Sequence, residues 1–311
     1  MKPPQSETAS AVPWKMRPVP CENGWMIHAP AKINLFFEVL GKRSDGFHEI
    51  VSLACPVSLY DTLYFESTES PEWTLEIHGE STGIPTDRRN IVIRVLEEFR
   101  CETGVRHGGR FVLVKRIPSQ AGLGGGSSDA AAALLLVNRV QRRRLDRGAL
   151  CRIGARVGSD VPLFLLSGGS LSRGRGEQVD PVAGLTGMHF VIVKPEEGLS
   201  TAEVYRSCMA VHDGEFRHVE PMLDALRLRN GRKFAQSFFN RLEVPAETLW
   251  PQGKKLADAI RQCGCPVAQM SGSGTAVFGL CRSATHARRA AAILSNRIPG
   301  RIFVVTTVAD A

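Results

Sequence analysis

Apolar positions in the first third of the chain run continuously or alternate, as β-strands do, and then switch to helical spacing. Ile91, Val95 and Phe99 recur on one face of a segment that also carries polar residues. Runs rich in β-branched and apolar residues flank this segment and are bounded by turn residues. We expect strands at residues 27–40, 50–65, 73–78 and 111–115, and a helix at 90–101.

The remaining two thirds mix helical and strand patterns, which predicts an α+β protein in two units. We expect helices at 129–140, 145–157, 201–209, 221–226, 254–263 and 284–295, strands at 190–194, 267–270, 276–280 and 302–308, and short apolar pieces at 163–166 and 169–172. Glycine and proline cluster without periodicity at 176–187, which indicates a boundary between domains at 25–181 and 182–311. Residues 1–24 carry five prolines and predict a disordered arm.

Composition and charge narrow the classes of partner. The 311 residues are 43% hydrophobic and 23% charged, which suits a large core, and no apolar run approaches the roughly 20 residues of a membrane span. We therefore expect a cytoplasmic protein without a membrane partner. The net charge of +8 favours an anionic ligand. No aromatic residues interleave with the basic run at 139–147, so we assign it to the end of a helix and expect no nucleic-acid partner.

The eight cysteines are scattered along the chain. Only Cys263 and Cys265 are close, with C-x-C spacing but no second pair and no histidine near them in the sequence. We expect reduced core thiols here rather than a metal site.

The most informative segment places four glycines within residues 122–126, directly before Ser127, Ser128, an aspartate and four alanines. A glycine-rich bend that runs into a helix presents free backbone N–H groups and a positive dipole end, and it lacks Cβ atoms that would block a close approach. This arrangement favours the binding of a phosphate group. The alternative is a plain glycine-rich turn with a serine or aspartate N-cap. The segment matches neither G-x-x-x-x-G-K-[ST] nor G-x-G-x-x-G.

Three segments, in order, resemble the motifs of the galactokinase, homoserine kinase, mevalonate kinase and phosphomevalonate kinase superfamily, the GHMP kinases. They are residues 30–35 (PAKINL), 118–131 and 270–275 (MSGSGT), and the resemblance covers about Ala29 to Val308. Residues 31–50, 158–177, 200–205 and 238–243 point to the branch that phosphorylates a diphosphocytidyl sugar alcohol in the non-mevalonate isoprenoid pathway. The resemblance implies an N-terminal ATP-binding α/β domain with a left-handed crossover and a C-terminal ferredoxin-like domain.

The resemblance also implies the site. Lys32 and Asp160 would form the catalytic pair, in which Asp160 accepts the proton of the attacking alcohol and Lys32 offsets charge. The implied ATP-binding residues are Asn90, Ile91, Pro118, Gly122, Leu123, Gly124, Gly125, Gly126, Ser127 and Ser128. The implied substrate-binding residues are Asn34, Phe47, His48, Asp160 and Gly272. Phe47 would stack on cytosine and His48 would hydrogen-bond to it.

The sequence departs from the family pattern at three positions. Phe47 stands where tyrosine is usual, Ala54 lies near the position of a second aromatic, and Gln120 replaces a small residue before the glycines. Stacking would survive the first change. The second means that the pyrimidine clamp is either completed differently or binds less tightly, and the third could narrow the phosphate loop.

Three functional hypotheses remain open from sequence. The first is an ATP- and Mg²⁺-dependent kinase, monomeric or weakly dimeric, acting on the diphosphocytidyl sugar alcohol. The second is a sister kinase for mevalonate, homoserine or a sugar. The third is a non-catalytic nucleotide-binding regulator, which the presence of both Lys32 and Asp160 argues against. The sequence identifies no metal ligands.

Overall fold

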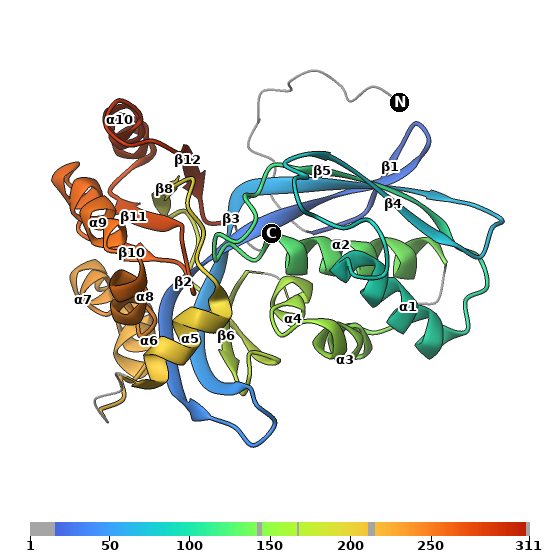
Figure 1. The fold of residues 1–311 in the computed structure, drawn as a ribbon, viewed down its shortest axis with the longest axis horizontal. Helices are drawn as coiled ribbons and strands as arrows, with labels where there is room; N and C mark the ends of the chain where they lie inside the picture. The colour runs from blue at the N-terminus through green and yellow to red at the C-terminus, as the bar shows by residue number, and fades with distance from the viewer. Residues whose placement is uncertain (1–15, 142–144, 167, 211–214, 309–311) are drawn as a thin grey trace.

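The computed structural model describes residues 16–141, 145–166, 168–210 and 215–308, and it contains two β-sheets with helices packed against them (Figure 1). The larger sheet comprises β1 (Val19–Cys21), β2 (Gly24–Lys42), β3 (His48–Ser67), β4 (Trp73–Gly79), β5 (Gly109–Lys115), β6 (Gly169–Arg173), β7 (Gln178–Val182) and β9 (Phe239–Asn240). Its main strand order is β1-β2-β3-β5-β4, with β6 and β7 continuing from one part of β3 and β9 pairing with β2.

Strands β2 and β3 are long strands at the centre of the larger sheet. They are long antiparallel partners whose register shifts at three places, including the step between Pro30 and Ala31. Their central residues are buried on both faces, which explains why their apolar runs are continuous rather than alternating. Strands β4 and β5 are parallel neighbours, and the helix between them in sequence makes this pair the crossover of the domain.

Four helices cover one face of the larger sheet (Figure 1). They are α1 (Ile91–Thr103), α2 (Gly125–Val140), α3 (Arg147–Val157) and α4 (Val161–Leu165). Helix α2 lies against β2, and its four alanines, residues 130–133, are fully buried. Small side chains allow this helix to approach the sheet and its neighbours closely, so the glycine-rich segment at its start is held against β2.

The second sheet contains β8 (His189–Lys194), β10 (Ala268–Met270), β11 (Val277–Cys281) and β12 (Arg301–Thr306) in the antiparallel order β10-β11-β8-β12. Its helices are α5 (Thr201–Ala210), α6 (Glu220–Arg227), α7 (Gly231–Gln236), α8 (Glu243–Leu249), α9 (Gln252–Gln262) and α10 (Ala284–Ser295). A helical segment between β8 and β10 and one helix between β11 and β12 give the βαββαβ pattern of a ferredoxin-like domain. The α+β class is confirmed.

Several local expectations were wrong. Residues 19–24, expected in a disordered arm, pair β1 with the start of β2, and residues 1–15 lie outside the described part of the chain. Strand β7 lies in the segment expected to be irregular, because pairing with β6 fixes it. Helices α7 and α8 and strand β9 were not predicted, since each is short and is determined by tertiary contacts. Residues 142–144 of the basic run also lie outside the described residues.

Candidate active site

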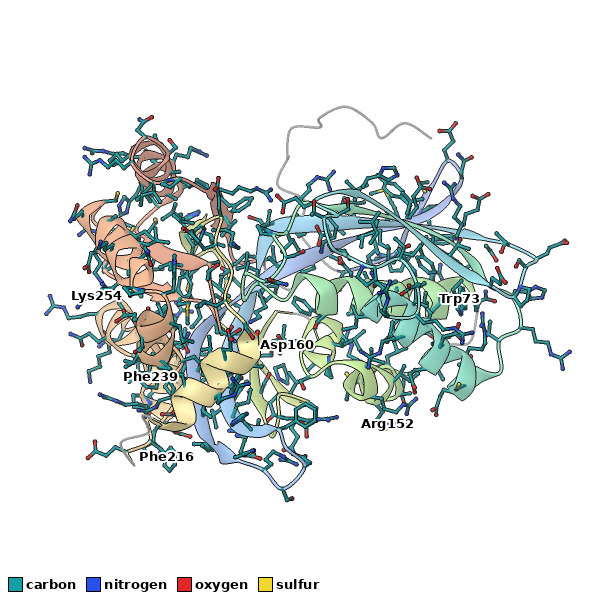
Figure 2. The ribbon with its side chains drawn as sticks, viewed as in Figure 1. Trp73, Arg152, Asp160, Phe216, Phe239 and Lys254 are labelled. Atoms are coloured by element: carbon teal, nitrogen blue, oxygen red, sulfur yellow. The ribbon has the colours of Figure 1, made fainter. Side chains whose placement is uncertain are left out.

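A cavity of about 1180 Å³ opens between the two sheets. Segments distant in sequence line it: β2, the β2–β3 turn, the loop before α1, the glycine-rich segment, the loop before α4, helix α5 and the β10–β11 turn. Figure 2 places Asp160 near the middle of the molecule, where the domain with the larger sheet meets the ferredoxin-like domain. The lining is polar at both ends, with backbone N–H groups at one and aromatic and cationic side chains at the other.

The glycine-rich segment ends in a helix cap made by backbone alone. Helix α2 begins at Gly125, four residues earlier than predicted, and its N-cap is Gly124 with φ 69° and no side-chain hydrogen bond. The alternative of a serine or aspartate N-cap is therefore wrong. Because no side chain caps this end, the first N–H groups of the helix remain available to a ligand. A Cβ at Gly122 would lie 1.9 Å from the carbonyl oxygen of Ser271, so that position requires glycine.

Lys32 and Asp160 meet across this end of the cavity. The Nζ of Lys32 lies 3.9 Å from Oδ2 of Asp160, with the lysine side chain 6% exposed and the aspartate side chain 42% exposed. Burial lowers the pKa of Lys32, and the carboxylate of Asp160 partly offsets this by raising it. The backbone N–H of Lys32 donates to the carbonyl of Leu123 at 2.9 Å, which fixes the lysine relative to the glycine-rich segment.

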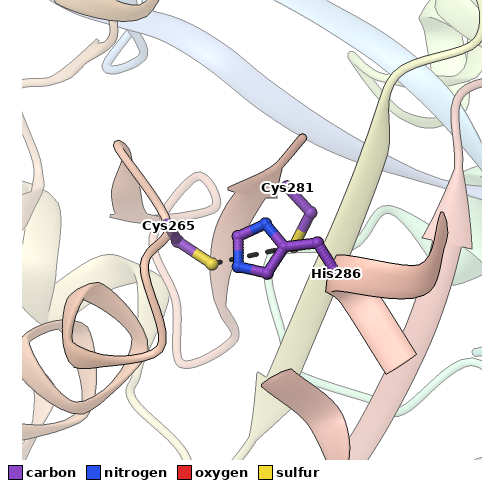
Figure 3. Close-up of side chains that lie close together, drawn as sticks. All are labelled: Cys265, Cys281 and His286. Carbon is purple, nitrogen blue, oxygen red and sulfur yellow. Dashed lines mark hydrogen bonds between the residues drawn. The ribbon is translucent and has the colours of Figure 1, made fainter. Parts of the chain in front are cut away.

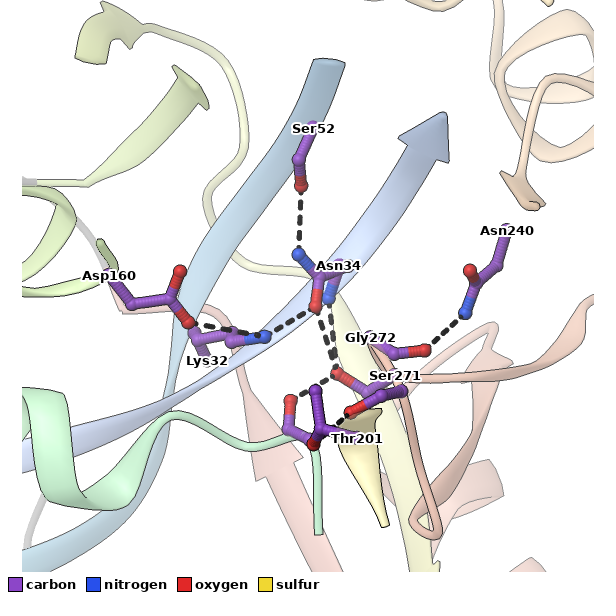
Figure 4. A network of polar contacts seen from close by, with 10 residues as sticks. Lys32, Asn34, Ser52, Asp160, Thr201, Asn240, Ser271 and Gly272 are labelled. Atoms are coloured by element: carbon purple, nitrogen blue, oxygen red, sulfur yellow. Dashed lines mark hydrogen bonds and ion pairs between the residues drawn. The ribbon is translucent and has the colours of Figure 1, made fainter. Parts of the chain in front are cut away.

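A polar network behind Lys32 joins the two glycine turns (Figure 4). Lys32 donates to Oδ1 of Asn34 at 2.5 Å, and Asn34 donates to Ser52 at 2.8 Å. The hydroxyl of Ser271 donates to the carbonyl of Gly122 at 2.9 Å. Asn240, on β9, donates to the carbonyls of Met270 and Gly272 at 2.9 and 2.8 Å. The amide of Asn34 is thus occupied by its hydrogen bonds to Lys32 and Ser52.

Three rings form the opposite end of the cavity. Phe47 is 48% exposed, and the guanidinium of Arg175 lies 4.9 Å from its ring centroid. The rings of His48 and Tyr205 are tilted by 30° with centroids 4.7 Å apart. Burial and the neighbouring Lys42 lower the pKa of His48, so its ring is held neutral at lower pH than a free histidine. Helix α5 supplies Tyr205 as a further aromatic ring, which fits the expectation that the clamp is completed differently from the position near Ala54.

Cationic side chains surround this aromatic end. Lys42, Arg175 and Arg206 line the cavity from the end of β2, the turn between β6 and β7, and α5. Arg175 is held in place by a 3.0 Å hydrogen bond to the carbonyl of Ala155. Three cations beside stacked rings suit an anionic ligand that carries an aromatic base.

A buried ion cluster supports the wall of the cavity beside α2. Lys115 is bonded to Asp61 and, at 2.8 Å, to Asp129 in the first turns of α2. The pKa of Asp129 is raised well above its ordinary value, mainly by burial. The ammonium of Lys115 lowers this pKa, and the carboxylate of Asp61 raises it. Asp61 also accepts from the backbone N–H of Ile117 at 2.9 Å. The cluster ties β3 and the end of β5 to the glycine-rich segment.

The structure brings together most of the predicted site residues. Those that line the cavity are Lys32, Phe47, His48, Asn90, Ile91, Pro118, Gly122, Leu123, Gly124, Gly125, Gly126, Ser127, Asp160 and Gly272. Two do not. Asn34 is buried behind Lys32, and Ser128 is fully buried with no hydrogen-bond partner for its hydroxyl among the described residues. Ser128 is directed away because one helical residue rotates a side chain by about 100°.

Sequence reasoning missed several lining residues, namely Lys42, Arg89, Lys115, Asp129, Arg175, Thr201, Tyr205 and Arg206. Most are single charged or aromatic residues outside the three motifs, and no local pattern marks them. Tyr205 had a signal, because it ends the stretch STAEVY, which already carried part of the resemblance. No helix of the described residues is long and apolar enough to cross a bilayer.

Two family models match the chain. The GHMP kinases N terminal domain matches residues 90–168, and the GHMP kinases C terminal domain matches residues 222–300. A 4-diphosphocytidyl-2-C-methyl-D-erythritol kinase of Pelotomaculum thermopropionicum is 36% identical over 264 residues, which cover 85% of this chain and 91% of that protein. One from Deinococcus radiodurans is 37% identical over 278 residues, covering 88% and 89%.

Solved structures agree. A crystal structure of 4-(cytidine 5'-diphospho)-2C-methyl-D-erythritol kinase is 37% identical, with a TM-score of 0.77, and covers 92% of this chain and 100% of that one. The homoserine kinase of Cytophaga hutchinsonii has a TM-score of 0.75 at 18% identity and covers 93% and 96%. At that identity the second match shows the shared fold alone.

Proposed function

The chain belongs to the 4-diphosphocytidyl-2-C-methyl-D-erythritol kinases of the GHMP kinase family, and we propose that it transfers the γ-phosphoryl group of ATP to the free hydroxyl at position 2 of 4-diphosphocytidyl-2-C-methyl-D-erythritol. The reaction serves the non-mevalonate route to isoprenoid precursors. The two ends of the cavity would bind different groups. The glycine-rich end would bind the ATP phosphates, and the aromatic end would bind the cytidine.

The uncapped start of α2 supports the first half of the proposal. Gly124, Gly125 and Gly126 line the cavity, and the cap makes no side-chain hydrogen bond, so N–H groups and the helix dipole face the triphosphate. Asn90 and Ile91 lie at the start of α1 in the same cavity, where the adenine would bind. Asn90 already uses its side-chain oxygen to cap α1 at 2.8 Å, so its contribution would be to shape the wall.

The catalytic step depends on Lys32 and Asp160. Asp160 is the exposed partner, so its carboxylate can accept the proton of the hydroxyl as that oxygen attacks the γ-phosphorus. The buried Lys32 stays 3.9 Å away and offsets the negative charge that collects on the transferring phosphoryl group. Its bond to Asn34 keeps the ammonium in one position. Position and charge account for most of the rate enhancement in such transfers.

The aromatic end would hold cytidine diphosphate. The base would lie against Phe47, with Tyr205 beside His48 completing the enclosure, while neutral His48 hydrogen-bonds to the polar edge of the ring. Lys42, Arg175 and Arg206 would pair with the diphosphate. The substrate carries the nucleotide at one end and the alcohol at the other. The cavity suits it because its lining includes both the aromatic residues and the pair of Lys32 and Asp160.

Magnesium would enter with ATP. Its ligands are oxygen atoms, and Ser127 places a hydroxyl on the cavity side of the first turn of α2, which fits a cation shared with phosphate oxygens. When bound, the ion supplies charge neutralisation between the phosphates.

The observation that carries the proposal is the meeting of His48, Tyr205 and Phe47 in one cavity with Lys32 and Asp160. Calorimetric titration with CMP and UMP tests it. CMP should bind and compete with the sugar-nucleotide substrate, and UMP should bind more weakly because its exocyclic group reverses a donor to an acceptor. Equal binding, or no binding of either, would favour a sister kinase with a smaller alcohol.

A further inference from the structure

We infer that the C-terminal domain contains a binding site for a soft divalent cation, with zinc as the natural choice, formed by Cys265, Cys281 and His286. The site lies outside the kinase cavity and is independent of the proposed reaction. Figure 3 shows the three side chains converging from three segments: the turn after α9, the end of β11 and the first turn of α10. One ligand atom from each residue lies within 4.8 Å of the others.

The distances fit a metal better than a disulfide. The two sulfur atoms lie 3.6 Å apart, far longer than the roughly 2.05 Å of a disulfide bond. Zinc binds thiolate at about 2.3 Å, which places two sulfurs of a tetrahedral site about 3.8 Å apart. Three atoms mutually within 4.8 Å share a point no more than about 2.8 Å from each, so small side-chain movements bring all three to bonding distance.

One hydrogen bond of His286 suits this role, and the other would be given up on metal binding. Nε2 of His286 lies 2.9 Å from the carbonyl oxygen of Cys263, and the backbone N–H of Arg282 donates to Nδ1 at 3.1 Å. A carbonyl only accepts, so Nε2 carries the proton and Nδ1 holds a lone pair. A ring that donates its other N–H to a backbone carbonyl is the usual support of a metal-binding histidine. A metal on Nδ1 would replace the Arg282 contact.

The two thiols face each other, with their Sγ atoms in hydrogen-bond contact. Both thiols are buried and both are free. Gly279 makes room for them, since a Cβ there would lie 3.0 Å from the sulfur of Cys265. Binding of Zn²⁺ would replace the two S–H bonds with two Zn–S bonds and release two protons, leaving one tetrahedral position for water.

The site would fasten α9, β11 and α10 together at the base of the hairpin whose tip carries Gly272. The spacing of the three residues in the sequence does not indicate a metal site, because 15 residues separate the two cysteines and the histidine follows on another element. A hard cation such as Mg²⁺ prefers oxygen ligands and would not occupy it.

The test uses the full chain, reduced and stripped of metal with a chelator, and titrated with Co²⁺ or Zn²⁺ alone. We expect one equivalent of Co²⁺ to produce thiolate-to-metal charge-transfer absorption, Zn²⁺ to displace the Co²⁺ and abolish that absorption, and Mg²⁺ to leave it unchanged. Zn²⁺ added to the metal-free chain should release two protons. Zn²⁺ should also raise the thermal midpoint. The absence of Co²⁺ absorption in the reduced wild-type chain, or of proton release with Zn²⁺, overturns the inference without any variant.

Variants then locate the site. The double variant C265A/C281A should lose at least about 100-fold in affinity for Zn²⁺, and His286→Ala at least about 10-fold. Cys208→Ala is the matched control, because Cys208 is another buried thiol of the same half, and it should bind like wild type. Circular dichroism and kinase turnover confirm that each variant is folded. Undiminished Zn²⁺ binding by a folded C265A/C281A chain, or equal loss in C208A, would place the metal elsewhere and overturn the assignment.

Discussion

The ammonium of Lys32 lies 3.9 Å from the carboxylate of Asp160, and only the aspartate is substantially exposed to the cavity. This asymmetry suits the roles that we propose: the exposed group can meet an incoming hydroxyl, and the buried group supplies a fixed charge. It also makes Asp160 suitable for mutation, because an exposed side chain contributes little to folding.

Replacing Asp160 by asparagine removes the proton acceptor and keeps the shape. We expect kcat to fall at least ~10²-fold, with the thermal midpoint close to that of wild type. Steady-state kinetics at saturating ATP and acceptor measure the effect. Turnover near the wild-type rate would remove Asp160 from the chemistry.

The pH profile reports on Lys32. Burial lowers its pKa below the ordinary value of 10.5, so this lysine loses its proton at a lower pH than a free one. If the charge is required, kcat/KM should decline along an alkaline limb centred below pH 10.5. The residual activity of Lys32→Met should lack that limb. An identical limb in both proteins would assign it to another group.

Gly126 offers a mild test of the phosphate-binding segment. An added Cβ would lie 3.6 Å from Ile91, an ordinary contact, so Gly126→Ala should fold and even gain about 0.5 to 1 kcal/mol as a helical residue. The methyl group would stand at the wall that faces the ATP phosphates, and we expect ATP affinity to fall about 10-fold or more, equivalent to about 1.4 kcal/mol.

Gly148→Ala is the control for that change. Gly148 lies in the first turn of α3, outside the cavity lining, and its added Cβ would also meet only ordinary contacts, the nearest at 3.4 Å. Calorimetry should show unchanged ATP affinity in this variant. If Gly126→Ala also bound ATP normally, the segment would be a structural turn. Valine at Gly125 is a harsher change, because its Cβ would lie 3.0 Å from Ile117 and 3.2 Å from the ammonium of Lys115.

The aromatic end should respond selectively to mutation. Stacking on a base contributes roughly 1–3 kcal/mol, so Phe47→Ala or Tyr205→Ala should raise the KM of the sugar nucleotide about 5- to 150-fold. The KM of ATP should change little in either variant. His48→Ala should instead erode the preference for CMP over UMP, because it removes a hydrogen-bonding partner. Equal losses of ATP affinity would place these rings at the ATP end or in the fold.

Much of this architecture was predictable because its signals are local. The long strands, the helix that starts near Asn90 and the glycine-rich segment each depend on neighbouring residues. The motif at 30–35 and the stretch at 158–177 pointed to Lys32 and Asp160 in the same way. Residues 19–24 and strand β9 were not predictable, because pairing with β2 fixes them.

The remaining site residues depend on tertiary contacts. Tyr205 reaches His48 across 157 positions, and Lys115 meets Asp61 and Asp129 from separate elements. The sequence also assigned Asn34 to the substrate, whereas its amide groups hold Lys32 and Ser52. Such pairings carry no periodicity, so only the folded chain reveals them.

ADP formation with a panel of alcohols shows which acceptor receives the phosphoryl group. The panel contains 4-diphosphocytidyl-2-C-methyl-D-erythritol, mevalonate, homoserine and galactose, each with ATP and Mg²⁺. We expect kcat/KM for the diphosphocytidyl alcohol to exceed that for every other acceptor by at least about 10³-fold, because the proposed site makes polar contacts to the cytidine. Faster turnover of mevalonate, homoserine or galactose, or no acceptor-dependent ADP formation at all, would contradict this expectation.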